Sequence, residues 1–328
     1  MAFDNAPSAV HLDQLLTNLT LDYVTDQNFI ADKIFPVVDV AKKSDEFYTF
    51  DPAESNREVD ANSLLLAPRT EPRKFDVSHG KDSYMAQVYG LGFDIDVQTA
   101  ANEDENLNVR QRKAKQLMHK MMAARDRHFI NTFMKTGVWS TDLAGATDFT
   151  KWSDGASTPI DDVRKWKRDF QIRNYGFKPN KMVITQDIVD ELMANTQILG
   201  RINGGATISN PAMVDMQLLA QVFAVDEVLV ADAVTNTAAV GATEAADYMI
   251  KDQILLTYTP MEAGLETPAS GLIFAWNSIP GTSWGITMES FTDDALRRQQ
   301  IAEQVHAKTA YDMKVVGASL GTYVSDVI

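Results

Sequence analysis

The sequence predicts an α+β protein built around one very long helix. A helical pattern covers 103–136 without a break, and helices alternate with strands over 159–275. An extended segment containing a proline precedes both at 33–40. These three observations predict an arm, a central helix and two strand-rich regions.

The segment at 33–40 is an apolar run interrupted by Pro36. Because proline cannot donate a ladder hydrogen bond, such a strand is confined to a sheet edge or to a crossing arm. We therefore predict that residues 1–45 form an arm that crosses a neighbouring subunit instead of packing on its own core. Its predicted assembly residues are Phe35, Pro36, Val37 and Val38. Helical spacing over 11–23 is diluted by polar residues and predicts a short helix at most.

Residues 51–76 are rich in proline and charge, and their apolar group is Leu64, Leu65 and Leu66. A stretch of this length without its own core is normally functional or disordered. Predicted strands at 46–50 and 73–78 favour a projecting hairpin over 46–80, and a plain disordered loop is the alternative. The residues expected to contact another subunit are Glu54, Arg57, Glu58, Leu64, Leu65, Leu66, Arg69 and Glu71.

A strand pattern over 84–97 leads into the long helix. Asn102 can cap this helix, and the acids at 103–105 oppose the positive end of its dipole. At ~1.5 Å per residue the helix spans nearly 50 Å, so it is predicted to be a structural beam. Its predicted apolar stripe consists of Leu107, Ala114, Met118, Met121, Met122, Phe129 and Phe133.

A basic face lies opposite this stripe, at Arg110, Lys113, Lys120 and Arg127. Seven basic residues and one acid, Asp126, lie between Arg110 and Arg127. Such a face is usually solvated. Two other interpretations stay open: an acidic partner surface, such as the projecting loop of a neighbour, and weak contact with DNA.

The remaining elements follow from shorter patterns. Loop-like composition covers 142–158, and small, turn-forming residues cover 232–247. Helices are predicted at 159–174, 186–199 and 212–223, and strands at 181–185, 227–231, 247–260 (a strand pair), 272–276, 284–289 and 312–316.

Composition excludes several classes of function. The 328 residues include no cysteine, which excludes disulfides, thiolate metal sites and cysteine catalysis. We find no signal peptide and no apolar run near the ~18 residues that span a bilayer, so neither secretion nor membrane contact is expected. The net charge of −15 argues against direct binding of duplex DNA. It indicates solubility, or a surface that can lie near nucleic acid without adhering to it.

No catalytic motif is found. Asp94 and Asp96 have the spacing of paired carboxylates, but strands routinely place two acids on the solvent side. The five histidines form no metal-binding pattern, and there is no phosphate loop, dinucleotide site or serine elbow. We predict no enzyme activity, no catalytic residue, no cofactor and no metal site. An α/β enzyme with an unrecognised site is the alternative.

Several motifs carry a resemblance to a known family. They are Phe35-Pro36-Val37 in the arm, the strand Glu227-Val228-Leu229-Val230, the loop Asn236-Thr237-Ala238 with Gly241, the strand ending Tyr258-Thr259-Pro260, and the closing Gly321-Thr322-Tyr323. In this order and spacing they resemble the major capsid proteins of tailed phages. The fold of that family is shared with herpesvirus capsid floors and bacterial encapsulins.

The resemblance implies a division of the chain. Residues 1–45 would be the N-arm, 46–80 the E-loop, 81–158 the peripheral domain with the spine helix at 103–136, 159–275 the axial domain and 276–328 the strands that return to the peripheral domain. Asn236, Thr237 and Gly241 would form an axial loop that meets symmetry mates at capsomer centres.

The resemblance also implies a function. The chain would assemble with itself as hexamers and pentamers into an icosahedral head around double-stranded DNA, which is held by confinement with weak contact. A separate scaffolding protein, a portal and a decoration protein are the further partners considered. The expected location is the virion, after assembly in the host cytoplasm. An encapsulin-like compartment shell is the alternative within the fold.

Overall fold

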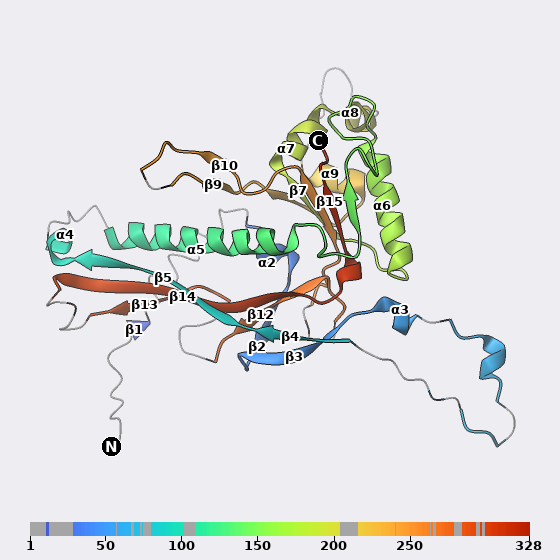
Figure 1. Ribbon diagram of the computed structural model, residues 1–328, viewed down its shortest axis with the longest axis horizontal. Coiled ribbons are helices and arrows are strands. Elements are labelled where there is room, and N and C mark those ends of the chain that lie inside the picture. The colour runs from blue at the N-terminus through green and yellow to red at the C-terminus, as the bar shows by residue number, and fades with distance from the viewer. Residues whose placement is uncertain are drawn as a thin grey trace.

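A long helix lies along one sheet, and a second sheet stands near the C-terminal end of that helix, in the computed structural model of the chain (Figure 1). The helix is α5 (Val109–Phe133). The structure describes residues 11–12, 29–56, 58–66, 69–72, 74, 80–101, 109–203, 216–239, 241–262, 264, 267–278, 284–292, 296 and 299–328.

The first sheet is organised by one long strand, β14 (Ile301–Val315). β13 and β12 pair with successive parts of one edge of β14, and β5 pairs with its other edge. All these pairings are antiparallel, and β2 then joins β12 in parallel. The other strands of this sheet are β1 (His11–Leu12), β2 (Val37–Val40), β5 (Gln87–Asp96), β12 (Gly271–Trp276) and β13 (Thr287–Phe291).

Helix α5 packs on this sheet through its apolar stripe. Its first half covers Met288 of β13 and Val305 of β14, while Phe129 and Phe133 near its end join a second cluster with residues of both sheets. The stripe is confirmed for Ala114, Met118, Met121, Met122, Phe129 and Phe133, which are all buried. The predicted stripe residue Leu107 lies outside the described residues, and a short helix, α4 (Val97–Ala101), precedes that gap.

The segment at 29–40 corrects one prediction. It forms helix α2 (Ala31–Ile34) and the edge strand β2, and Ile34 and Phe35 are fully buried. The Phe35 ring lies 5.0 Å from that of Phe129, and a Cβ on Gly271 would lie 2.3 Å from Phe35 Cζ. The prediction of an edge position is confirmed. The prediction that this run avoids its own core is wrong, because the core buries Phe35 in a space that only glycine at 271 leaves open.

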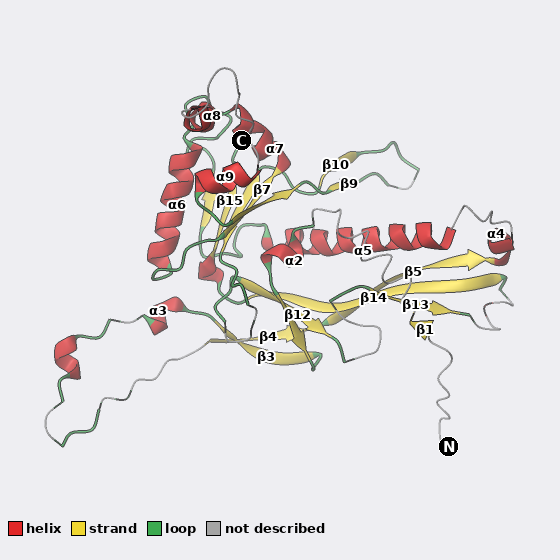
Figure 2. Ribbon diagram, turned by 180° about the vertical axis from the view of Figure 1, so that it is seen from behind, coloured by secondary structure: helices red, strands yellow, loops and turns green. Residues whose placement is uncertain are grey.

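A hairpin projects from the body beyond the C-terminal end of α5 (Figures 1 and 2). Its strands, β3 (Ser44–Thr49) and β4 (Gly80–Met85), pair antiparallel, and Phe47 and Tyr84 pack on Phe274 at its base. The intervening residues include α3 (Pro52–Ser55) and the 3-10 helix η1 (Ala61–Leu64). A projecting hairpin agrees with the prediction, although its return strand is β4; residues 75–79 lie outside the described part.

The second sheet has the strand order β6-β15-β11-β7-β8. Two tryptophans, Trp152 and Trp166, stack at 5.8 Å in its main hydrophobic cluster. The strands are β6 (Asp142–Ala144), β7 (Lys181–Thr185), β8 (Glu227–Ala231), β11 (Gln253–Thr257) and β15 (Gly321–Ser325). The helices are α6 (Pro159–Arg173), α7 (Gln186–Ala194), α8 (Thr196–Asn203) and α9 (Met216–Phe223), with the 3-10 helix η2 (Ala318–Leu320) before β15. A second hairpin, β9 (Val234–Asn236) and β10 (Ala246–Tyr248), extends from this region.

Sheet membership differs from the predicted domain ranges. β6 and β15 fall in the ranges assigned to the peripheral domain, yet they belong to the second sheet; β12 falls in the axial range, yet belongs to the first. The cause is that β15 pairs with β11 over five residues, so the chain returns to the second sheet after β14. The helix predicted at 186–199 is also divided, into α7 and α8. Of the range 11–23, where a short helix at most was predicted, the structure describes only the two residues of β1.

Candidate assembly surfaces

The projecting loop between β3 and β4 presents apolar side chains to solvent. Leu64, Leu65 and Leu66 are 58%, 83% and 53% exposed. Asp51 Oδ1 accepts the Ala53 N–H and Asp60 Oδ1 accepts the Asn62 N–H, so these acids cap α3 and η1. Local capping thus orders η1, which ends at the exposed Leu64, and the exposed Leu65 and Leu66 follow it directly.

The charged residues predicted for this loop are only partly described. Glu58, Arg69 and Glu71 are exposed, and Arg69 adopts a left-handed φ of 69°. Arg57 and the side chain of Glu54 lie outside the described residues.

The predicted basic face of α5 is divided by the strands beside it. Arg110 Nη2 lies 2.8 Å from Glu303 Oε1 of β14, and Lys113 Nζ donates to the Asp94 carbonyl of β5 at 3.0 Å. These two cations therefore bind residues of the chain's own first sheet. Lys120 and Arg127 are exposed. The helical wheel could not show this division, because it contains no information on which flank a strand covers.

Two further cations extend the exposed set. Arg112 and Lys135 are exposed, like Lys120 and Arg127. None of these four has an ion pair with any residue that the structure describes. We call Arg112, Lys120, Arg127 and Lys135 the cation ridge.

Two adjacent charges, Arg125 and Asp126, are buried on α5, and sequence reasoning missed both. Asp126 Oδ1 accepts the N–H groups of Ile30 at 3.0 Å and Ala31 at 2.9 Å. Burial outweighs these hydrogen bonds and raises the pKa of Asp126 to about 6. The sequence did contain one indication that Asp126 is buried, because residue 126 lies one helical turn from the stripe residues Met122 and Phe129.

Arg125 fixes the chain that leads into β13. Its guanidinium lies 3.7 Å from the ring centroid of Trp284, and Nη2 donates to the Trp284 carbonyl at 2.7 Å. Burial lowers the pKa of Arg125 to about 10, so the side chain stays charged at neutral pH. Its role is to hold the first sheet on the long helix.

The predicted axial loop is the tip of the β9–β10 hairpin. Asn236 Oδ1 accepts the N–H groups of Ala238 and Ala245, and Thr237 Oγ1 donates to the Ala245 carbonyl. Gly241 has a φ of +86°, which favours glycine. All three residues therefore shape the turn. The hairpin and the projecting loop extend toward opposite sides of the molecule (Figure 1).

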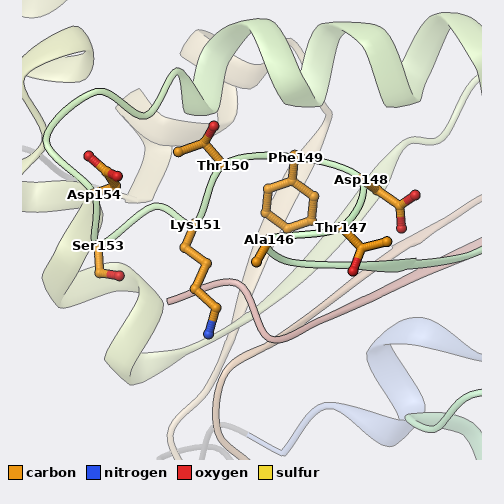
Figure 3. Close-up of a pocket in the computed structure, with 8 residues that line it drawn as sticks. All are labelled: Ala146, Thr147, Asp148, Phe149, Thr150, Lys151, Ser153 and Asp154. Carbon is orange, nitrogen blue, oxygen red and sulfur yellow. The ribbon is translucent and has the colours of Figure 1, made fainter.

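One surface hollow of about 700 Å³ lies in the loop at 146–154 (Figure 3). Lys151 Nζ contacts Asp326 Oδ1 at 2.5 Å and the Ile328 carbonyl at 3.0 Å, so it anchors the C-terminal residues. Asp148 and Asp154 accept backbone N–H groups of their own loop. The three charged side chains that line the hollow, Asp148, Lys151 and Asp154, thus have structural partners.

Other candidate chemistry is sparse. Within the described ranges, no group of histidine and carboxylate side chains is arranged to hold a metal ion. Asp94 Oδ1 accepts a hydrogen bond from Gln304 Nε2, which supports its structural interpretation. The described helices also include none that is both long and apolar enough to cross a membrane.

Comparison with known proteins identifies the fold. No protein-family model matches the sequence, and no curated protein matches it. A phage-related protein from Bordetella bronchiseptica superposes with a TM-score of 0.69 at 18% identity, covering 97% of this chain and 98% of that one. The capsid of cyanophage P-SCSP1u gives 0.52 at 13% identity, over 89% and 86% of the chains. An encapsulin complex from Synechococcus elongatus gives 0.54 at 9% identity, over 93% and 89%. The chain therefore has the fold of phage capsid and encapsulin subunits, as its motifs predicted.

Proposed function

We propose that this chain is the major capsid protein of a tailed phage, which assembles as hexamers and pentamers into an icosahedral head around double-stranded DNA. The observation that carries the proposal is the projecting loop. Three consecutive exposed leucines on an extension of a capsid-type fold form an apolar patch of the kind that another copy can bury.

The energetics favour association through this loop. Fully burying a leucine side chain contributes about 1.5–3 kcal/mol relative to leaving it exposed. Leu64, Leu65 and Leu66 form no part of the chain's own hydrophobic clusters, whose described members lie in the two sheets and their helices. Their burial in a neighbour would offset part of the entropy lost when subunits associate.

The second hairpin supports contacts on another side. The β9–β10 tip, with Asn236, Thr237 and Gly241, extends away from the projecting loop (Figure 1). A subunit with extensions on opposite sides can contact different neighbours through each, as a closed ring requires. We propose this tip as the axial contact at capsomer centres.

Further partners follow from the same proposal. A separate scaffolding protein, a portal and a decoration protein are proposed for the head, which is assembled in the host cytoplasm. DNA would be held mainly by confinement, because the net charge of −15 opposes adhesion. The proposed role requires no cofactor and no catalytic residue.

An encapsulin-like compartment is the second candidate, favoured by the match to the encapsulin complex. The motif order favours the phage role. The two candidate functions differ in what the shell contains, because a phage head encloses DNA and a cellular compartment encloses protein cargo.

The test is electron microscopy of particles purified from cells that express the chain, followed by analysis of their content after nuclease treatment. Closed shells support the shell function, and nuclease-protected DNA in shells from infected or induced cells supports the phage role. A protein that stays a small soluble species under all conditions contradicts both candidates.

A further inference from the structure

The solvent side of α5 contains no acidic residue. From 110 to 135 the exposed residues are the four of the cation ridge, two amides and one alanine: Arg112, Gln116, Lys120, Ala124, Arg127, Asn131 and Lys135. The acid of this range, Asp126, is buried. The net charge of the whole chain is −15, so this side of the helix has the opposite sign to the protein as a whole.

These seven residues form one strip along the helix, which we call the α5 strip. At ~100° per residue the six that lie within α5 occupy an arc of about 120° around the helix axis. Arg112, Lys120 and Arg127 follow one another at intervals of about 10–12 Å along that axis. Lys135 continues the strip just beyond the end of the helix. Because α5 lies along the first sheet (Figure 1), the strip is long, narrow and evenly charged.

The ridge cations of the strip are available to bind a partner. Arg110 and Lys113 lie on the same helix but contact strands of the first sheet. The four ridge cations have no ion pair with any residue in the described part of the chain. Their charges therefore remain to be neutralised by ions or by another molecule.

The composition of the strip fits a polyanion better than a protein. The centre of a protein interface is rich in aromatic and apolar side chains, whereas the apolar member of the strip is the small Ala124. Arginine, lysine, asparagine and glutamine side chains are the groups that contact nucleic-acid phosphates. Duplex DNA carries one negative charge per about 1.7 Å of its axis, so evenly spaced cations meet phosphates without a fixed register.

We propose that the α5 strip binds the phosphate backbone of double-stranded DNA, so that the face of the first sheet covered by α5 is the inner face of the shell. The inference rests on the proposed shell function and names the surface that meets the packaged DNA. Binding is independent of base sequence, because phosphate contacts carry no base information. One copy binds weakly, since the net charge of −15 opposes adhesion, and many copies in one shell act together on the same DNA molecule.

Salt-dependent binding by the isolated subunit provides the first test, with a short duplex DNA as the probe. Four phosphate contacts predict that the logarithm of the binding constant falls with the logarithm of salt concentration with a slope of about −3.6. We expect the natural subunit to bind the duplex at low salt and to release it as salt rises. Lys120→Gln/Arg127→Gln should weaken binding at low salt by at least about tenfold and reduce the magnitude of the slope by about two.

Two control variants accompany this measurement. Arg164→Gln/Arg168→Gln removes the same charge from exposed positions of α6 and should leave the slope unchanged. Lys120→Arg/Arg127→Lys keeps both charges and should bind like the natural subunit. Thermal unfolding should be the same in all variants, because these side chains are exposed. Absence of binding at low salt, an unchanged slope in the ridge variant or an equal loss in the α6 variant overturns the proposed phosphate contacts.

Photocrosslinking in filled heads provides the second test. The natural chain has no cysteine, so one introduced cysteine can carry a photoactivatable label. Lys120→Cys places the label on the strip, and Val88→Cys is the matched control. Val88 is 47% exposed, and its neighbour Tyr89 faces α5, with its ring 6.0 Å from that of His128. Because successive strand residues point to opposite faces, Val88 lies on the face of the sheet away from α5.

The outcomes separate the strip from the shell function. Crosslinking to DNA from Lys120→Cys but not from Val88→Cys supports the proposal. Closed, filled heads in which Lys120→Cys gives no DNA crosslink, crosslinks to another copy instead, or crosslinks no better than Val88→Cys overturn the inner-face assignment and leave the shell function intact. Closed shells without DNA contradict the phage role, and the salt dependence then decides the phosphate contacts alone. Absence of closed shells for the natural chain overturns the shell function.

Discussion

Asp126 accepts a hydrogen bond from the backbone N–H of Ala31 at 2.9 Å, across 95 positions of sequence. The same oxygen accepts the Ile30 N–H, so one carboxylate in the middle of α5 caps the first turn of α2. This contact fixes where the N-terminal segment meets the long helix. Phe35 then enters the core one turn later, and β2 follows at the sheet edge.

Removing the Asp126 carboxylate should destabilise the subunit. Asp126→Ala leaves two buried N–H groups without an acceptor, and each unsatisfied group costs about 1–3 kcal/mol. Asp126→Asn retains an acceptor oxygen and should lose less stability at neutral pH. Denaturant unfolding of both variants measures the difference. Equal stability of Asp126→Ala and the natural protein would show that these hydrogen bonds contribute nothing net.

The contribution of Asp126 to folding stability changes with pH in a definite direction. Its folded pKa, about 6, lies above the ordinary 3.8, so the folded state binds the proton more tightly than the unfolded state. The corresponding stabilisation is fully present below pH 3.8 and is lost as the pH rises through about 6. A rise of this size corresponds to roughly 3 kcal/mol at most.

We therefore compare the natural protein with Asp126→Asn. The unfolding free energy of the natural protein relative to the variant should fall between pH 4 and 6 and become constant above pH 7. A relative stability that increases over this interval would contradict the assigned burial.

Truncation of Phe35 should affect folding before assembly. Large-to-small substitution of a buried phenylalanine costs about 3–5 kcal/mol, and Phe35 lies against Phe129 and Phe133. Phe35→Ala should therefore lower the thermal midpoint of the isolated subunit. Lys33→Ala, at an exposed position of α2, is the matched control and should leave it unchanged. A stable Phe35→Ala subunit that only fails to assemble would restore the original arm prediction.

The helices and strands that are specified by nearby residues were predicted from the sequence. Helix α6 was predicted from its start signal at 159–162 and from Gly176 just beyond its end. In the structure Val163, Trp166 and Phe170 recur at helical spacing and are buried. Strand β7 was predicted because it is a short apolar run between turn signals.

The strand and the buried charges that the sequence analysis missed depend on contacts between distant parts of the chain. Most of β14 escaped prediction because His306 and Lys308 interrupt its apolar pattern. In the fold, His306 packs on Phe291 and Lys308 Nζ lies 2.6 Å from Glu289 Oε2 on the adjacent strand. Arg125 and Asp126 were missed for the same reason, because their partners at Trp284 and Ala31 are distant in sequence.

Isolated subunits should not retain duplex DNA. The cation ridge presents exposed positive charge on α5 and just beyond its end, but the whole chain carries −15. Filter binding at physiological salt should show no stable complex, and any complex at low salt should weaken steeply with added salt. Tight retention at physiological salt would contradict the proposed confinement of DNA.

The leucines of the projecting loop provide the sharpest test of architecture. Leu64→Ser/Leu65→Ser/Leu66→Ser should leave the unfolding free energy of the isolated subunit nearly unchanged, because these side chains are already exposed. The same variant should lose stable shells, since each leucine buried in a neighbour contributes about 1.5–3 kcal/mol. Replacement of all three by methionine preserves apolar surface and should preserve assembly. Replacing residues 54–70 by a short Gly-Ser linker should likewise leave subunit unfolding unchanged and prevent shells. Unfolding of the isolated subunit by either change would place the segment in the chain's own core and would refute its role as a contact between copies.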